Sequence, residues 1–300
     1  MTTMRGALEM MTTTTVADWK TSAPTWWCPG CGDFGDLSAL QKALVAVGYA
    51  PEEVVIVAGV GCSGKIGNYV NSYNMHVTHG RTLPIAMGVK LANPHLKVIA
   101  AGGDGDGFAL GMGHFMHACR RNVDMTYIVM DNQIYGLTKG QTSPTSAPGF
   151  ESKSTPEGNV EGAVDPLMLA LTAGATFVAQ GFTGNQKKLQ AVLEAGLQHR
   201  GFAFINTFSP CPTYNKVNTF DFFRTELHDI DEDPGYRPND RIRAMQVLLQ
   251  HRQLLQGVFY REERPSFHEL LPGFSEDKPP VNPDWQLSPA LWGKLLNLYR

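Results

Sequence analysis

The sequence predicts an α/β fold in which a parallel sheet is flanked by helices. Between residues 38 and 210, short and continuously apolar runs alternate with segments of helical character. Unbroken apolar runs are typical of strands buried on both faces, as in a parallel sheet covered by helices. Polar, glycine-rich segments follow several of these runs, at the sheet edge where such folds bind ligands. With 300 residues, 43% of them hydrophobic, the chain is long enough to bury a large core.

The predicted elements alternate, beginning with a helix at 38–48 ("SALQKALVAVG") and a buried strand at 53–61 ("EVVIVAGVG"). The strand segments are short apolar runs, whereas the helical segments are mostly longer and mix apolar with polar residues. The others are, in order, a helix at 83–93, a strand at 97–103, a helix at 107–120, a strand at 125–132, a helix at 165–174, a strand at 175–182, a helix at 185–201 and a strand at 202–210. A further short helix is expected near 240–255.

Composition divides the chain into three parts. Residues 1–24 are Thr-rich and polar without a signal-like apolar stretch, and we expect a flexible N-terminal tail. Residues 25–220 hold the alternating elements and form one α/β domain. Residues 221–300 are polar and Pro-rich, and we expect a C-terminal extension that packs on the core or on a partner.

Charge and hydropathy exclude some classes of protein. The net charge of -3 gives no indication of nucleic-acid binding, and no apolar run of about 18 residues predicts a membrane span. We expect a cytoplasmic protein. Disulfides are rare in that compartment, so the five cysteines require another role.

The stretch "GGDGDG" (102–107) ends one predicted strand and opens a helix. Glycines let the backbone approach a diphosphate, whose charge a helix N-terminus favours. Asp104 and Asn132 each end a strand, and adjacent parallel strands would bring them side by side. A carboxylate, an amide oxygen and a backbone carbonyl suit Mg²⁺. The pattern therefore predicts a metal-held diphosphate, and its alternative is a glycine-rich turn with solvated aspartates.

This spacing resembles the thiamine diphosphate motif, in which GDG is followed, after 26 intervening residues here, by an asparagine. The resemblance implies that Mg²⁺ is held by Asp104, by the side chain of Asn132 and by the backbone carbonyl of Ile134.

Four cysteines lie in three segments that end near the same predicted sheet edge. Cys28 and Cys31 form a CxxC in "WWCPGCGD", Cys62 lies in "GVGCSGK" and Cys211 in "SPCPTYN". Four such thiols suit a [4Fe–4S] cluster or a zinc site. A thioredoxin-like pair at the CxxC would leave the other two unexplained. Cys119, within a helix, is expected to pack as a small apolar residue.

These segments, with "THGR", "GDGD" and "DNQIYGLTKGQ", resemble the β subunit of 2-oxoacid:ferredoxin oxidoreductases over roughly residues 25–220. The resemblance implies a thiamine diphosphate-binding domain of the pyrophosphate type. It also implies a single [4Fe–4S] cluster on Cys28, Cys31, Cys62 and Cys211. Its cofactor contacts map to Ser63, Gly64, Thr78, His79, Gly80, Arg81, Gly105, Asp106, Gly136 and Leu137.

Cations near the cofactor are candidates for substrate binding and catalysis. Lys65, His79 and Arg81 are the candidates we name, and Lys139 is a weaker one. His114 and His117, at i and i+3, are expected to be packing or surface residues because no third ligand is nearby.

The resemblance implies oxidative decarboxylation of a 2-oxoacid to an acyl-CoA, or the reverse carboxylation, with electrons passed to ferredoxin. It also implies a separate α subunit that supplies the pyrimidine-type domain, in an (αβ)₂ heterotetramer. We favour 2-oxoglutarate over pyruvate because Lys65 could pair with a distal carboxylate. The alternatives are a non-oxidative thiamine diphosphate decarboxylase or synthase, and a zinc-stapled subunit without catalytic activity.

Overall fold

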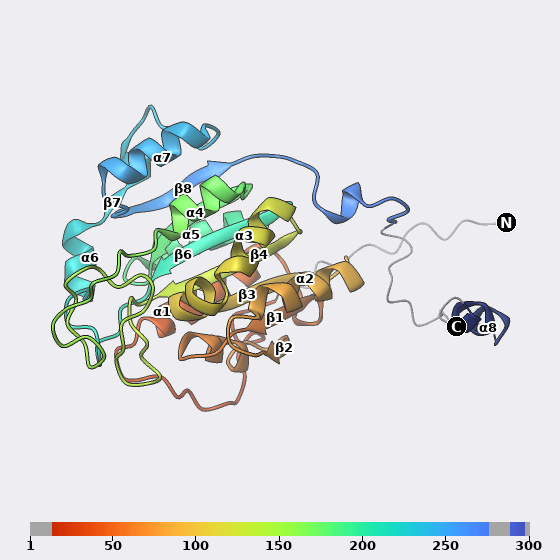
Figure 1. Cartoon of the computed structure of the whole chain (residues 1–300), viewed down its shortest axis with the longest axis horizontal. Helices are drawn as coiled ribbons and strands as arrows, with labels where there is room; N and C mark the ends of the chain where they lie inside the picture. Colours follow the sequence, from red (N-terminus) through yellow and green to blue (C-terminus); the bar gives the residue numbers. More distant parts are fainter. Residues whose placement is uncertain (1–13, 276–288, 298–300) are drawn as a thin grey trace.

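The protein is described by a computed structural model that covers residues 14–275 and 289–297. An eight-stranded sheet has the order β2-β1-β3-β4-β6-β5-β8-β7, and helices cover its two faces (Figure 1). The strands are β1 Val54–Ala58, β2 Tyr73–His76, β3 Lys97–Gly103, β4 Met125–Asp131, β5 Phe177–Phe182, β6 Phe202–Phe208, β7 His228–Asp229 and β8 Leu255–Arg261. The helices are α1 Asp33–Ala46, α2 Thr82–Ala92, α3 Met112–Arg121, α4 Pro166–Ala173, α5 Gln186–Leu197, α6 Phe220–Glu226, α7 Arg241–Gln250 and α8 Pro289–Asn297.

The central strands are buried on both faces. Along β1, Val55 and Val57 pack in the cluster that includes α2, α3, α4 and α7, whereas Val54 and Ile56 pack in the cluster that includes α1 and α5. Successive side chains of a strand point to opposite faces, so both faces need apolar residues. This explains why the strands are continuously apolar in sequence, and it confirms the predicted fold class.

The sheet is mixed, where the sequence predicted a parallel one. The β1, β3, β4, β6 and β5 ladders are parallel as expected, but β8 pairs antiparallel with β5. Sequence reasoning also missed the strand β2 and the helix α6, because both are short. The helix expected at 107–120 is interrupted: a π-helical turn over Asp106–Leu110 precedes α3, and Gly111 separates the two.

The N-terminal segment differs from the expected tail over its described part. Trp19 is fully buried in the core beside α1, and Gln41 Nε2 donates a hydrogen bond to the carbonyl of Trp19. Lys20 also forms an isolated β-bridge with Val70. Burying an indole removes a large apolar area from water, so residues around Trp19 are fixed on the domain. Residues 1–13 of the expected tail lie outside the described residues.

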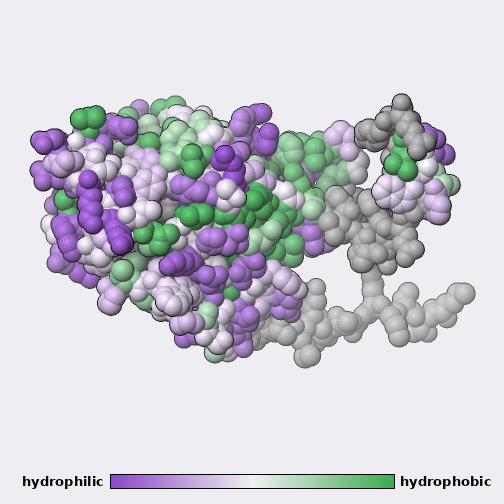
Figure 2. Space-filling view, turned by 60° about the horizontal axis from the view of Figure 1, so that its bottom comes forward, coloured by the Kyte–Doolittle hydropathy of each residue, from purple (hydrophilic) through white to green (hydrophobic). Residues whose placement is uncertain are grey.

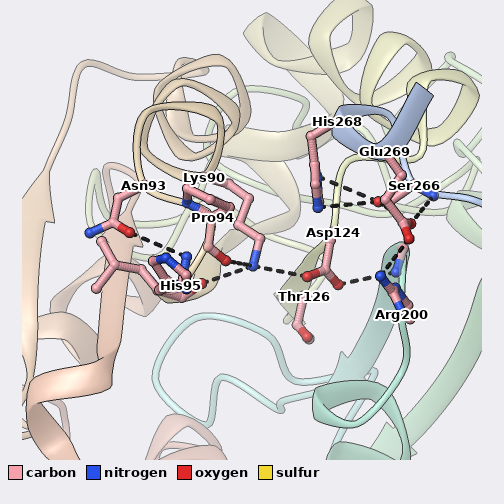
Figure 3. Close-up of polar contacts among 12 residues, drawn as sticks. Lys90, Asn93, Pro94, His95, Asp124, Thr126, Arg200, Ser266, His268 and Glu269 are labelled. Carbon is pink, nitrogen blue, oxygen red and sulfur yellow. Dashed lines mark hydrogen bonds and ion pairs between the residues drawn. The ribbon is translucent and has the colours of Figure 1, made fainter. Parts of the chain in front are cut away.

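The C-terminal extension is part of the sheet up to β8 and then crosses to the amino ends of β3 and β4. The backbone N–H of Phe267 donates to the carbonyl of Asn122, which directly follows α3. Figure 3 shows this region, where Glu269 pairs with Arg200 and accepts a hydrogen bond from Ser266, and Lys90 pairs with Asp124. The extension therefore packs on the core at the edge opposite to the predicted ligand site. The part of the expected extension at 276–288 and 298–300 lies outside the described residues.

Candidate functional site

The carboxyl ends of β1, β3 and β4 open into a cavity of about 550 Å³. Its walls combine the segment after β1, the Asp104 turn after β3 and the start of the long loop after β4. The lining residues are Val60, Gly61, Cys62, Ser63, His79, Gly103, Asp104, Gly105, Asp106, Asn132, Ile134, Tyr135, Gly136, Leu137, Thr138, Gln141, Thr142 and Ser154. Three predicted strand ends thus meet at one cavity, as the topology of a parallel sheet requires.

The three predicted magnesium ligands line this cavity together. Asp104 is buried, and burial raises the pKa of its carboxyl group. Hydrogen bonds from Ser143 and Thr145 lower the pKa again in part. Asn132 is buried as well, and its Oδ1 accepts a hydrogen bond from the backbone N–H of Ile134 at 3.1 Å. Within the described ranges, no group of three or more His, Cys, Asp or Glu side chains is arranged for a metal ion. A site of one carboxylate, one amide oxygen and one backbone carbonyl does not require such a group, and these oxygen donors suit Mg²⁺.

A second buried carboxyl group, which sequence reasoning missed, stands beside Asp104. Asp131 is 2% exposed, and burial together with the charge of Asp104 raises its pKa to about 7. The hydroxyl of Thr145 lies 2.7 Å from Asp104 Oδ2 and 2.9 Å from Asp131 Oδ1. The sequence feature that could have revealed this contact is the polar stretch "QTSPTS" (141–146), because it lies in a loop that is too long for a simple connection.

Gly105 is required by the packing of the cavity wall. A Cβ at this position would lie well inside van der Waals distance of the Tyr135 ring, whose hydroxyl is 3.3 Å from the carbonyl oxygen of Gly105. Gly105 and Tyr135 both line the cavity, so a side chain here would push the ring into it or away from it. Gly105 was predicted as a backbone cofactor contact, and its exposure to the cavity leaves that prediction open.

The carboxyl group of Asp106 joins the loops that surround the cavity. Its Oδ1 accepts hydrogen bonds from the backbone N–H groups of Val60 at 3.1 Å and Gly80 at 2.8 Å. Its Oδ2 accepts from the hydroxyl of Thr82 at 2.8 Å, and His79 Nε2 lies 3.8 Å from Oδ1. Because Asp106 is 2% exposed, these donors have no water to replace it. Asp106 therefore fixes the "THGR" turn, in addition to the backbone role predicted for it.

We expect Asp106→Ala to lower the free energy of unfolding by about 3 kcal/mol, because it leaves buried donors without an acceptor. Asp106→Asn should recover most of this loss, since its amide oxygen can accept from the two backbone N–H groups and its NH₂ can donate to the Thr82 oxygen. Urea unfolding measures both variants. Equal losses in Ala and Asn would contradict the hydrogen-bonding role.

Two of the predicted cluster cysteines, from two different segments, lie beside Gly136. A Cβ on Gly136 would lie 3.6 Å from Cys211 Sγ and 3.8 Å from Cys62 Sγ. Burial raises the pKa of the Cys31 thiol, and Cys211 and Cys62 add to this. Burial likewise raises the pKa of Cys62 to about 11, with smaller contributions from Cys211 and Cys28. Cys62 and Cys211 therefore lie close together, but the four predicted cluster cysteines are not arranged as a metal site within the described residues. Cys119 packs in the hydrophobic core.

Among the predicted cation candidates, Lys65, Arg81 and Lys139 lie outside the cavity lining. Lys65 is in a 3₁₀ helix over Ser63–Asn68, close enough to Cys62 for its charge to lower the pKa of that thiol. Arg81 is exposed, and its Nη1 donates to the carbonyls of Gly80 and Leu110 at 3.2 Å each. Lys139 is exposed in a turn with φ of 78°. Of the named cation candidates only His79 lines the cavity.

The predicted cofactor contacts divide into two groups. Cavity-lining positions are Ser63, His79, Gly105, Asp106, Gly136 and Leu137. Thr78, Gly64, Gly80 and Arg81 are not among the lining residues. Gly80 instead has a φ of +70° and packs against Leu110, which a residue with a Cβ would displace. Its part in the site is to shape the turn that carries His79.

Comparisons with known proteins agree with this geometry. Residues 59–207 match the family described as thiamine pyrophosphate enzyme, C-terminal TPP binding domain. Residues 211–276 match the family that describes the C-terminal part of the beta chain of pyruvate ferredoxin oxidoreductase. A 2-oxoacid:ferredoxin oxidoreductase subunit beta from Saccharolobus solfataricus is 47% identical over 71% of this chain and 70% of its own length.

Two further relatives are named for 2-oxoglutarate. A 2-oxoglutarate synthase subunit KorB from Archaeoglobus fulgidus is 43% identical over 83% of this chain and 89% of its own. The solved 2-oxoglutarate:ferredoxin oxidoreductase from Magnetococcus marinus, with 2-oxoglutarate, coenzyme A and succinyl-CoA bound, matches with a TM-score of 0.82 and 42% identity. It covers 86% of this chain and 89% of that one.

Proposed function

This chain belongs to the family of 2-oxoacid:ferredoxin oxidoreductase β subunits, and from that premise we propose that it binds thiamine diphosphate with Mg²⁺ beside one [4Fe–4S] cluster. The enzyme it serves would decarboxylate a 2-oxoacid to an acyl-CoA, or run the reverse carboxylation, with ferredoxin as the electron carrier. One observation supports this most strongly: Cys62 and the three predicted magnesium ligands line the same cavity.

The residues present suit both inorganic groups. Asp104, Asn132 and the carbonyl of Ile134 offer hard oxygen ligands for Mg²⁺, which would neutralise a diphosphate. Cys28, Cys31, Cys62 and Cys211 offer the thiolates for an iron–sulfur cluster. When bound, the thiazolium of the cofactor supplies an electron sink for the carbon that loses CO₂, and the cluster supplies one-electron chemistry.

The protein positions the groups around the cavity, and Gly136 forms part of its lining next to two cysteines. Gly136 lines the cavity together with Cys62, and a side chain on Gly136 would contact the sulfur atoms of Cys62 and Cys211. The absence of a side chain there leaves space between the cavity and these two sulfur atoms, which would hold a cluster if one were bound. Asp106 holds the turn that presents His79 to the cavity, where the imidazole can donate to or accept from a substrate oxygen.

A partner subunit is needed to complete the site. Membership of the β-subunit family implies an α subunit that supplies the pyrimidine-type domain of the cofactor site. Leu137, which lines the cavity, is 48% exposed, and Leu110 beside the "THGR" turn is 59% exposed. In Figure 2 several hydrophobic residues gather on one face of the molecule among hydrophilic ones, as at protein interfaces. We propose an α subunit at the mouth of the cavity, in an (αβ)₂ assembly.

Metal and cofactor analysis of the complex, purified without oxygen, tests this function against its alternatives. We expect iron and sulfide close to four atoms each per β subunit, and thiamine diphosphate binding that depends on Mg²⁺. Cofactor binding without iron would favour a non-oxidative decarboxylase or synthase. Zinc in place of iron, together with no cofactor binding, would favour a non-catalytic subunit with a structural zinc site.

The described part of the chain contains no helix long and apolar enough to cross a membrane. None of the five cysteines forms a disulfide. A cytoplasmic location is part of this proposal, because reducing compartments keep thiols in that state.

We propose 2-oxoglutarate as the substrate, with Lys65 as the residue that selects it. Lys65 is half-buried in the 3₁₀ helix that follows the lining residue Cys62, and its charge lowers the pKa of that thiol, which burial raises. No Lys or Arg lies among the lining residues. A distal carboxylate buried without a cation would cost several kcal/mol, of order 3–5 when one partner of a buried pair is removed. Pyruvate has no such carboxylate to pair.

We therefore expect Lys65→Ile to lower kcat/KM for 2-oxoglutarate by about 100-fold or more while changing kcat/KM for pyruvate much less. Steady-state kinetics with both substrates measure the difference. Lys42→Ile, on the exposed side of α1, is the matched control and should alter neither value. Equal losses on both substrates would remove Lys65 as the selector, and a wild type that prefers pyruvate would overturn the substrate itself.

A further inference from the structure

The loop that follows β4 carries a buried turn of hydroxyl side chains beneath the predicted magnesium ligands. Ser143, Thr145 and Ser146 are each 5% exposed or less. The turn is closed by the backbone N–H of Ser146, which donates to the carbonyl of Ser143, and by the hydroxyl of Ser146, which accepts from the N–H of Ser143. Hydroxyl groups are normally exposed in a surface loop. The groups to which these buried hydroxyls bond therefore indicate the role of the turn.

These partners belong to two of the segments that carry the predicted magnesium ligands. Thr145 Oγ1 is 2.7 Å from Asp104 Oδ2, and Ser146 Oγ donates to the carbonyl of Gln133 at 2.8 Å. Gln133 separates the other two predicted ligands, Asn132 and Ile134. One rigid turn thus contacts the carboxylate from β3 and the backbone segment after β4. Movement of the turn would change the spacing between them.

Thr145 also contacts a second buried carboxyl group, that of Asp131. Its hydroxyl is 2.9 Å from Asp131 Oδ1, and Asn206 Nδ2 approaches Asp131 Oδ2 at 3.3 Å. Two buried carboxyl groups so close together repel one another when both are charged. A hydroxyl between them replaces the water that burial excludes, and its contact with Oδ2 fixes one oxygen of the Asp104 carboxyl group.

We propose that Thr145 is a positioning residue for the cofactor metal, which orients the carboxylate of Asp104 toward Mg²⁺ and separates it from Asp131. This rests on the proposed function, since it assumes that Mg²⁺ and the diphosphate bind at Asp104. Groups that hydrogen-bond to a metal ligand fix its orientation, and their loss typically weakens metal affinity by about 10- to 100-fold.

The test is a calorimetric titration of Mg²⁺ into the complete enzyme complex in the presence of saturating thiamine diphosphate. Thr145→Val, which keeps the shape and removes the hydroxyl, should weaken Mg²⁺ binding by about 10- to 100-fold. Thr145→Ser, which keeps the hydroxyl, should stay within about threefold of the wild type. Thr145→Ala removes the hydroxyl without placing a methyl group against two carboxyl groups, and it gives the same comparison if the Val variant does not fold.

Thr126→Val is the matched control. Thr126 is 5% exposed like Thr145, and its hydroxyl makes a buried hydrogen bond to the carbonyl of Gly196 at 3.2 Å, near the amino end of β4. It should lose stability without losing Mg²⁺ affinity. If folded Thr145→Val or Thr145→Ala binds Mg²⁺ as tightly as the wild type, the positioning role is wrong and the proposed function stands. If the wild type binds no Mg²⁺ with the cofactor, the proposed function itself fails.

Discussion

Asp104→Ala is expected to abolish retention of thiamine diphosphate by the assembled enzyme while its iron content stays unchanged. Asp104 is the carboxylate among the three predicted magnesium ligands, and it is 2% exposed. Removing it leaves Mg²⁺ with two neutral oxygens from the protein, so the diphosphate charge is poorly compensated. A loss of about 4 kcal/mol, or about 1,000-fold in affinity, is the scale of one such ligand.

Cofactor content after gel filtration, and calorimetry with Mg²⁺ and thiamine diphosphate, measure this loss. Asn132→Ala should act in the same direction. Asp124→Asn is the control, because Asp124 pairs with Lys90 at the amino end of β4, away from the cavity (Figure 3). Tight cofactor binding by Asp104→Ala would show that the diphosphate is held elsewhere.

Replacing any one of Cys28, Cys31, Cys62 or Cys211 by serine should remove or destabilise the iron–sulfur cluster and stop electron transfer. Cys62 and Cys211 lie beside Gly136, and burial together with the charges of Cys211 and Cys62 raises the pKa of the Cys31 thiol. A hydroxyl is a far poorer ligand for iron than a thiolate, so one substitution suffices. We expect iron content and visible absorbance to fall together, with reduction of ferredoxin at background level.

Cys119→Ser is the matched control for this series. Cys119 is fully buried in α3 within the hydrophobic core, so the variant should lose some stability but keep its iron. Iron that depends on Cys119 and not on Cys211 would refute the ligand set. Stoichiometric zinc in place of iron in the wild type would refute the cluster.

Much of the architecture follows from local pattern. The strand at 97–103 has the predicted bounds, and the strands predicted at 53–61 and 202–210 are observed as β1 and β6 with shorter carboxyl ends. The carboxyl end of β1 is shorter because Val60 and Gly61, which follow it, line the cavity instead of continuing the ladder. Local pattern shows that a segment is buried, but it does not show where pairing stops.

The candidate site was predictable to the same degree. Asp104, Asn132 and Cys62 were named because unusual residues follow buried strands, and parallel topology brings such ends together. The sequence did not reveal that Lys65 and Arg81 lie outside the cavity lining. Both belong to segments whose direction depends on contacts with other parts of the chain, such as the hydrogen bond from Arg81 to Leu110.

By itself, the sequence determined the alternation of helices and strands, the strand ends that carry polar residues, and the packing of Cys119 within an apolar helix face. These features are local, because backbone periodicity and burial act within each segment. Only the tertiary structure decided that β8 pairs antiparallel with β5, that Trp19 is buried, and that Thr145 stands between Asp104 and Asp131. Such contacts join residues far apart in the chain, and they depend on how loops and strands pack together, which no local pattern specifies.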